Sequence, residues 1–157
     1  MSRISSIDIG NIKVTALQDG ELVLPSEALL NLKDADAKTI QSDAENTLSY
    51  SNVNAYLIQT GDRNLLIDAG CRELFGPTCG CIQEALTEAG VYADQVTDLF
   101  LTHLHPDHIA GALTTHGTAV FENAQLHLVD TEHDFWMNGK FDAVEVNGAE
   151  WASLAKA

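Results

Sequence analysis

Positive charge is scarce in this sequence. Its 157 residues include 8 Lys and Arg against 23 Asp and Glu, which gives a formal net charge of −15 at pH 7. Proteins that bind nucleic acid present a basic surface to the phosphate backbone, and no basic cluster is found here. We therefore expect no nucleic-acid partner. We interpret the acidity mainly as a contribution to solubility, and secondarily as a bias toward cationic or neutral substrates.

Long apolar runs are also missing. No segment approaches the roughly 20 apolar residues that span a bilayer, and the first ten residues contain no apolar run of signal-peptide length. We expect a soluble, cytoplasmic protein with no membrane partner, although a secretion signal removed before residue 1 would leave the same sequence. Hydrophobic residues make up 45% of the chain, which is enough for a folded core.

Cysteine is rare, and the number of cysteines is odd: Cys71, Cys79 and Cys81. This excludes a framework of disulfides. Cys79 and Cys81 form a Cys-x-Cys pair, which could supply half of a soft metal site. The simpler interpretation is that they are small, half-buried residues near the start of a helix.

The apolar pattern predicts a single α/β domain over residues 1–157, with a mixed sheet. Turn signals at Asp19-Gly20 and Gly61-Asp62 predict two hairpins. The expected strands are Ile12–Leu17, Leu22–Leu24, Val53–Gln59, Asn64–Ile67, Val96–Leu101 and Gln125–Val129. The expected helices are Thr78–Ala89, Asp130–Met137 and Gly148–Ala157, with a short one at Ala28–Ala37 inside a polar segment, Ser26–Ser51, that is otherwise a loop.

The chemistry of the sequence is concentrated in Thr102-His103-Leu104-His105-Pro106-Asp107-His108, directly after the buried strand Val96–Leu101. Imidazole nitrogen and carboxylate oxygen suit zinc and similar divalent ions. A tight loop can direct alternate histidines at one metal and the following Asp-His pair at a second metal. Ligands in open α/β sheets gather after such strands. The pattern therefore predicts a metal site. The isolated residues His116, His127 and His133 lack ligand-like spacing, and we expect structural or surface roles for them.

This segment matches the His-x-His-x-Asp-His signature of the metallo-β-lactamase superfamily. Flanking segments also resemble that superfamily, and in part its methyl parathion hydrolase and quorum-quenching lactonase branch. They are Asn54-Ala55-Tyr56-Leu57-Ile58, Leu65-Leu66-Ile67-Asp68-Ala69-Gly70, Phe75-Gly76-Pro77-Thr78, Asp107-His108-Ile109-Ala110-Gly111, Phe121-Glu122-Asn123-Ala124 and Phe135-Trp136. The resemblance covers about residues 10–157.

The resemblance implies two divalent metal ions, with zinc the first candidate. His103 and His105 would bind the first metal, and Asp107 and His108 the second. Asp107 is also the candidate catalytic residue. Asp68 would be the buried carboxylate that holds the ligand loop from behind; the simpler interpretation is a turn residue after a strand. The implied reaction is attack of a metal-bound hydroxide on a small ester, lactone or phosphotriester.

The resemblance is limited to the N-terminal half of the family's αββα sandwich. The remaining metal ligands of the family lie in the other half, and a catalytic zinc commonly takes three protein ligands. The half-sheet would also expose an edge and an apolar face. We expect completion in one of three ways: this is a piece of a longer hydrolase, half of a two-chain enzyme, or a self-completing homo-oligomer.

Two other functions remain open at this point. The chain could be a non-catalytic half-domain that binds metal or a partner. It could also belong to another class within the superfamily, such as a glyoxalase-like thioesterase or a nuclease, although the lack of basic surface disfavours the nuclease. The sequence decides neither the substrate nor the metal.

Overall fold

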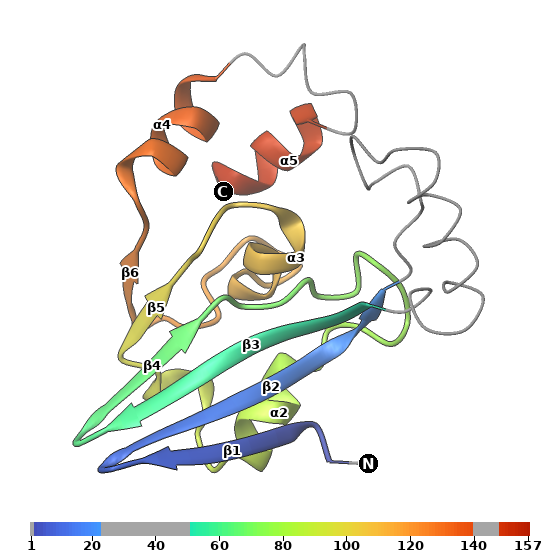
Figure 1. Cartoon of the computed structure of the whole chain (residues 1–157). Coiled ribbons are helices and arrows are strands. Elements are labelled where there is room, and N and C mark those ends of the chain that lie inside the picture. Colours follow the sequence, from blue (N-terminus) through green and yellow to red (C-terminus); the bar gives the residue numbers. More distant parts are fainter. Residues whose placement is uncertain (1, 23–50, 140–147) are drawn as a thin grey trace, which may run out of the picture.

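The computed structural model describes residues 2–22, 51–139 and 148–157. They form one mixed sheet, with one helix against the sheet and the others near the ends of its last strands (Figure 1). The strands are β1 (Ile4–Ile9), β2 (Ile12–Leu22), β3 (Ser51–Thr60), β4 (Arg63–Ile67), β5 (Asp98–Phe100) and β6 (Gln125–His127). The helices are α2 (Ile82–Glu88), η2 (Ala93–Gln95), α3 (Pro106–Ile109), η3 (Ala110–Ala112), α4 (Asp130–Asn138) and α5 (Gly148–Ala155).

The six strands lie in the sheet in the order of the sequence. β1 to β4 are antiparallel neighbours, whereas β4, β5 and β6 are parallel. Parallel neighbours require crossover connections, which here contain α2 and the ligand loop with α3. The predicted α/β class with a mixed sheet is confirmed.

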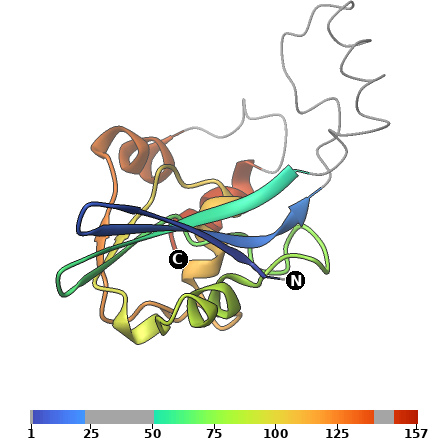
Figure 2. The ribbon, with the colours of Figure 1, turned by 60° about the horizontal axis from the view of Figure 1, so that its bottom comes forward.

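One face of the sheet carries the core. Alternate residues on neighbouring strands meet there, and the row Leu57, Leu66 and Leu99 is almost fully buried. Helix α2 packs on this face of β2 through Ile82, Ala85 and Leu86 (Figure 2). The period-2 pattern of the strands and the helical spacing in α2 therefore point to the same core.

The opposite face of the sheet is only partly covered within the described residues. Ile7 and Tyr56 are exposed there, and Ile58, Leu65 and Phe100 are half-buried. Strands β1 and β6 form the two edges of the sheet. The described residues thus show the partly exposed apolar face and the open edges that the sequence predicted for a half-sandwich.

Two predictions for the N-terminal strands are wrong. Asp19-Gly20 is no hairpin turn: β2 continues to Leu22, with a bulge between Gln18 and Gly20. The side chain of Asp19 is fully buried and accepts hydrogen bonds from the amides of Cys71 and Ile82, both at 2.9 Å. The expected strand Leu22–Leu24 is therefore the end of β2 as far as the structure describes it. Strand β1, which pairs with β2, was not predicted.

The other elements differ mainly at their ends. Helix α2 begins at Ile82 rather than Thr78, because residues 71–80 form a series of turns tied to Asp19. Helices α4 and α5 agree with the predicted segments; the residue before α4 is Val129, and no side chain caps that helix. The expected helix at Ala28–Ala37 and residues 26–50 of the predicted loop lie outside the described residues.

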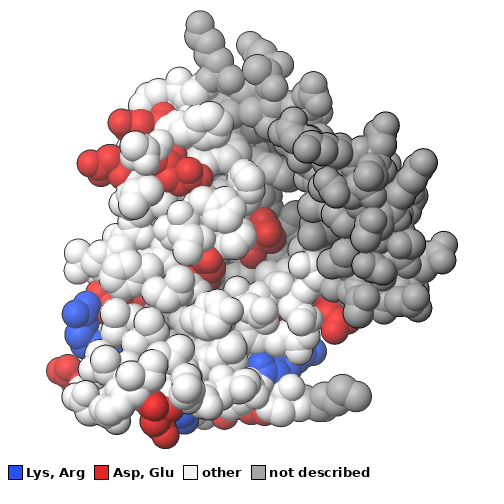
Figure 3. All heavy atoms as spheres, viewed as in Figure 1, with Lys and Arg blue, Asp and Glu red and all other residues white. Residues whose placement is uncertain are grey.

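Acidic groups are spread over the face shown in Figure 3, and the basic groups on that face are confined to the lower part of the view. This distribution agrees with the acidic composition. Among the described residues, no helix is both long and apolar enough to cross a membrane.

Candidate metal centre

The candidate site lies where the parallel strands β4 and β5 end side by side. Two backbone hydrogen bonds join the segment after β4 to β5 and to the histidine segment. The amide of Asp68 donates to the carbonyl of Phe100 at 2.8 Å, and the amide of Ala69 donates to the carbonyl of His108 at 2.7 Å. Asp68 has φ 60°, a left-handed conformation that Asp tolerates better than most residues. The ends of two parallel strands thereby bring Asp68 beside the histidine segment.

Close backbone packing holds this junction together. Gly111 donates a hydrogen bond to the carbonyl of Gly70 at 3.1 Å. A Cβ at Gly111 would lie 1.9 Å from the carbonyl oxygen of Ala69. Only glycine therefore allows η3 to approach the end of β4 this closely.

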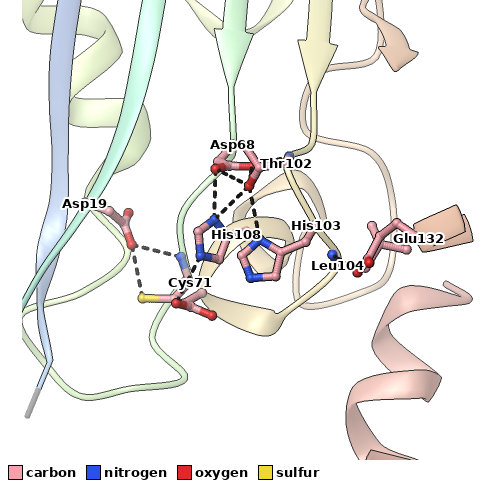
Figure 4. A network of polar contacts seen from close by, with 9 residues as sticks. Asp19, Asp68, Cys71, Thr102, His103, Leu104, His108 and Glu132 are labelled. Carbon is pink, nitrogen blue, oxygen red and sulfur yellow. Dashed lines mark hydrogen bonds and ion pairs between the residues drawn. The ribbon is translucent and has the colours of Figure 1, made fainter. Parts of the chain in front are cut away.

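The carboxylate of Asp68 contacts both Thr102 and His108 and so lies at the centre of the hydrogen-bond network (Figure 4). It accepts hydrogen bonds from the backbone amide of Thr102 at 2.8 Å and from the hydroxyl of Thr102 at 2.9 Å. Its Oδ2 also lies 2.8 Å from Nδ1 of His108. Asp68 is buried. It is therefore tied to the loop by several bonds, which is more than the plain turn residue of the simpler interpretation.

These contacts determine which ring nitrogens carry protons. The Thr102 hydroxyl has one proton, which it donates to the Asp68 carboxylate. Its oxygen, 3.1 Å from Nδ1 of His103, therefore accepts the Nδ1 proton of that ring. Asp68 accepts the Nδ1 proton of His108 in the same way. In the neutral form both rings then present Nε2 as the nitrogen with a free electron pair.

The structure brings three of the sequence-predicted donors into direct contact. The rings of His103 and His108 have centroids 3.9 Å apart, and Nε2 of His108 lies 3.2 Å from a carboxylate oxygen of Asp107. His105 lies at the start of α3, with its ring 4.6 Å from that of His103, centroid to centroid. Pro106 occupies the first position of α3, where its fixed φ favours the turn into the helix.

The pKa values reflect this crowding. Burial alone would lower the pKa of His108, but its hydrogen bonds to Asp107 and Asp68 outweigh burial and raise it to about 9. Burial would raise the pKa of Asp107, yet the hydrogen bond and charge of His108 lower it. Burial, and then the neighbouring His108 and His105, lower the pKa of His103. These shifts favour an imidazolium at His108 between the carboxylates of Asp68 and Asp107.

The donor set fits a divalent metal in kind and in orientation, because a ligating histidine commonly gives its other ring N–H to a carboxylate or another oxygen. The set is incomplete in number. Although His103, His108 and Asp107 are in contact, no group of three or more His, Cys, Asp or Glu side chains among the described residues is arranged so that it could hold a metal ion. The loop therefore offers oriented donors for part of a metal centre.

Residues that the sequence analysis gave no role complete the surroundings of the loop. Thr102 links Asp68 to His103, and its position inside the motif could have indicated this. Glu132 on α4 accepts a hydrogen bond from the amide of Leu104 at 2.9 Å. Trp136, one helical turn later, lies beside His105. The spacing of Glu132 and Trp136 places them on one helix face, which was the only signal available for this pair.

Within the described residues, the side chains of the remaining histidines and of the cysteines make no hydrogen bond to residues 102–108. His127 contacts Asp98 at 2.9 Å and stacks on Phe100, which agrees with the expected structural role. His116 and His133 are exposed. Cys79 is buried, and Cys81 directly precedes α2, as the simpler interpretation of the Cys-x-Cys pair expected. Burial, together with Asp19, raises the pKa of the Cys71 thiol, which makes that thiol unreactive.

Comparison with known proteins agrees with this geometry. Residues 49–124, which contain β3, β4, β5 and the ligand loop, match the model of the metallo-beta-lactamase superfamily. The hydrolase AbOPH of the beta lactamase superfamily superposes with a TM-score of 0.83 at 26% identity, over 99% of this chain and 55% of its own. The chain has the fold of about half of a metallo-β-lactamase-fold protein.

The quorum-quenching branch is also among the similar structures. AidC, a dizinc quorum-quenching lactonase, has a TM-score of 0.84 at 27% identity, over 99% of this chain and 58% of its own. A probable metal-dependent hydrolase from Staphylococcus aureus shares the fold, with a TM-score of 0.69 at 24% identity over 86% of this chain and 53% of its own. The chain thus spans little more than half the length of these metallo-β-lactamase-fold proteins, as the predicted N-terminal half would.

Proposed function

We propose that this chain supplies half of the active site of a metal-dependent hydrolase that acts on small esters, lactones or phosphotriesters. In this proposal His103 and His105 bind the first of two divalent metal ions, and Asp107 and His108 bind the second. The observation that supports it most strongly is the hydrogen-bonded chain from Asp68 through Thr102, which leaves Nε2 of His103 and His108 as the donor atoms.

When bound, such metal ions lower the pKa of a bound water and polarise the substrate oxygen that is attacked. The residues of the chain would orient the histidine ligands and supply negative charge beside the metal ions. Asp68 fixes the ring of His108, and Asp107 stays ionised next to it because its pKa is lowered. Asp107, which is half-buried, is the residue we assign to the reacting centre.

Zinc and a lactone are the first choices for metal and substrate class. Both His and carboxylate donors suit zinc. AidC, which resembles this chain at 27% identity, is a dizinc lactonase and was solved with an N-acyl homoserine product. A phosphotriester is the second choice.

Four donors are too few for two catalytic metals, since a catalytic zinc commonly takes three protein ligands. We propose that the missing ligands come from a further polypeptide segment, a second chain or another copy of this chain. The partly exposed face of the sheet, with Ile7 and Tyr56 exposed, is where such a partner would pack.

The absence of a three-donor cluster among the described residues favours one alternative, a half-domain that binds metal or a partner without turnover. Elemental mass spectrometry of the purified chain, together with hydrolysis assays on a lactone, an aryl ester and a phosphotriester, separates the two. We expect about two metals per chain and hydrolysis that a chelator abolishes. Metal without turnover in any assembly would support the alternative. A chain that retains no metal would contradict metal binding by these four donors alone, and hydrolysis would then have to be sought in an assembly that supplies the missing ligands.

A further inference from the structure

The carboxylate of Glu132 on α4 binds the ligand loop at its centre. Its Oε1 accepts a hydrogen bond from the backbone amide of Leu104, between the two histidines, at 2.9 Å (Figure 4). The same oxygen accepts the indole N–H of Trp136 at 2.6 Å. One oxygen atom thus joins the loop backbone to the helix that lies beside it.

The amide of Leu104 has a particular need for this partner. Leu104 follows the end of β5, so its N–H is beyond the ladder of the sheet, and the residue is only 4% exposed. A buried N–H without an acceptor is costly. The bond to Glu132 fixes the peptide plane between His103 and Leu104, and with it the directions in which His103 and His105 leave the backbone.

Through its bond to Trp136, Glu132 also acts on the ring of His105. Trp136 is 2% exposed, and its ring lies edge-on to that of His105, with centroids 5.8 Å apart. Trp151 of α5 contacts the same imidazole, at 5.0 Å between centroids. His103 and His108 each have a hydrogen bond at Nδ1, whereas within the described residues the His105 ring contacts the rings of His103 and of the two tryptophans and makes no hydrogen bond. His105 therefore depends on its backbone and on the tryptophans for its orientation.

We infer that Glu132 is a positioning residue for the first metal site, acting on His103 and His105 through the Leu104 amide and Trp136. It has the role at this side of the loop that Asp68 has at the other. Glu132 lies outside residues 49–124, which match the superfamily. This inference rests on the proposed function, because it assumes that His103 and His105 are ligands.

Cobalt binding to the full chain tests the inference, with the d–d absorption of Co²⁺ as the report on ligand geometry and chelator competition as the measure of affinity. For Glu132→Ala we expect affinity to fall about 10- to 100-fold, the usual cost of losing a partner that orients metal ligands. Glu132→Gln keeps an oxygen that can accept both bonds, so we expect it to restore affinity and spectrum. Asp134→Ala, on the exposed side of the same helix, is the control and should leave both unchanged.

Two further measurements separate positioning from loss of fold and from failure of the proposed function. Circular dichroism and urea unfolding identify variants that no longer fold. If Glu132→Ala does not fold, the cobalt affinity and spectrum of Glu132→Gln decide whether Glu132 has the positioning role. Hydrogen exchange at the Leu104 amide reports the bond without metal, and we expect faster exchange in Glu132→Ala alone. Unchanged cobalt binding in Glu132→Ala overturns the positioning role while the proposed function stands. No cobalt binding by the parent chain overturns the proposed metal binding by these four donors alone, and the positioning role with it.

Discussion

Two buried aspartates lie near opposite ends of the parallel strands, and each is joined to a histidine. Asp68, after β4, contacts Nδ1 of His108 at 2.8 Å, and Asp98, at the start of β5, contacts Nε2 of His127 at 2.9 Å. The Asp98 cluster is closed, because its carboxylate also accepts bonds from the Thr97 hydroxyl and from the Arg63 guanidinium. A buried carboxylate with that many donors has its hydrogen-bonding capacity satisfied and needs no metal ion or other ligand.

The Asp68 cluster differs in what lies beyond the histidine. Its bonds use the Nδ1 atoms of His103 and His108. Nε2 of His108 then faces the carboxylate of Asp107 at 3.2 Å, and both residues are proposed ligands of one metal. The ring of His127, by contrast, uses Nε2 for Asp98 and stacks on Phe100 with centroids 4.2 Å apart. The comparison teaches that an Asp–His pair is not a functional signal by itself. The second nitrogen of the ring, and what faces it, distinguishes a ligand from a structural residue.

Replacing the histidine of each cluster with alanine should give the largest difference in metal affinity between the two clusters. We expect His108→Ala to weaken binding of Zn²⁺ or Co²⁺ by at least about 100-fold, since it removes a proposed ligand rather than a partner behind one. His127→Ala should leave metal affinity unchanged while lowering the free energy of unfolding. Chelator competition and urea unfolding measure the two quantities. Equal losses of metal affinity in both variants would remove the distinction between the clusters.

Substitution of the aspartates tests the same distinction one step further from the metal. Asp68→Asn replaces an acceptor of the His108 Nδ1 proton with a weaker, neutral group, so we expect metal affinity to fall about 10- to 100-fold. Asp98→Asn should not alter metal affinity. Isothermal titration with zinc, on variants first shown to be folded by circular dichroism, measures the effect. An Asp68→Asn chain with the parental affinity would return Asp68 to the role of a turn residue.

The ligand loop was predictable because its donors are local. His103, His105, Asp107 and His108 follow one apolar strand within six residues, so their spacing alone indicated metal chemistry, and the resemblance supplied Asp68. The strand β3 was predictable for a similar reason, since its alternation of buried and exposed residues is complete within the segment. The assignment of the loop residues as ligands stays a prediction.

The contacts that the sequence did not predict join residues far apart in the chain. Asp19-Gly20 has the local pattern of a turn, but the partners of Asp19 are amides more than fifty residues later. A Cβ at Gly20 would lie 2.5 Å from the Cα of Cys79, so the glycine serves close packing rather than a turn. Glu132 reaches the Leu104 amide in the same non-local way. A backbone N–H leaves no mark in the sequence, and its acceptor therefore cannot be recognised from the pattern.

Acid titration of the closed cluster should give the smallest effect. The hydrogen bonds of Thr97 and Arg63 lower the pKa of Asp98 to about 2, below the ordinary value of about 3.9. A depressed pKa means that the folded state favours the ionised form, so this contribution to stability is complete above about pH 5 and is lost as pH falls toward 2. Urea unfolding of the parent chain and of Asp98→Asn, measured between these pH values, should show a pH-dependent difference that shrinks with acidity. A constant difference would mean that Asp98 contributes through packing rather than charge, and the closed cluster would then be held by shape instead of by its ion pair.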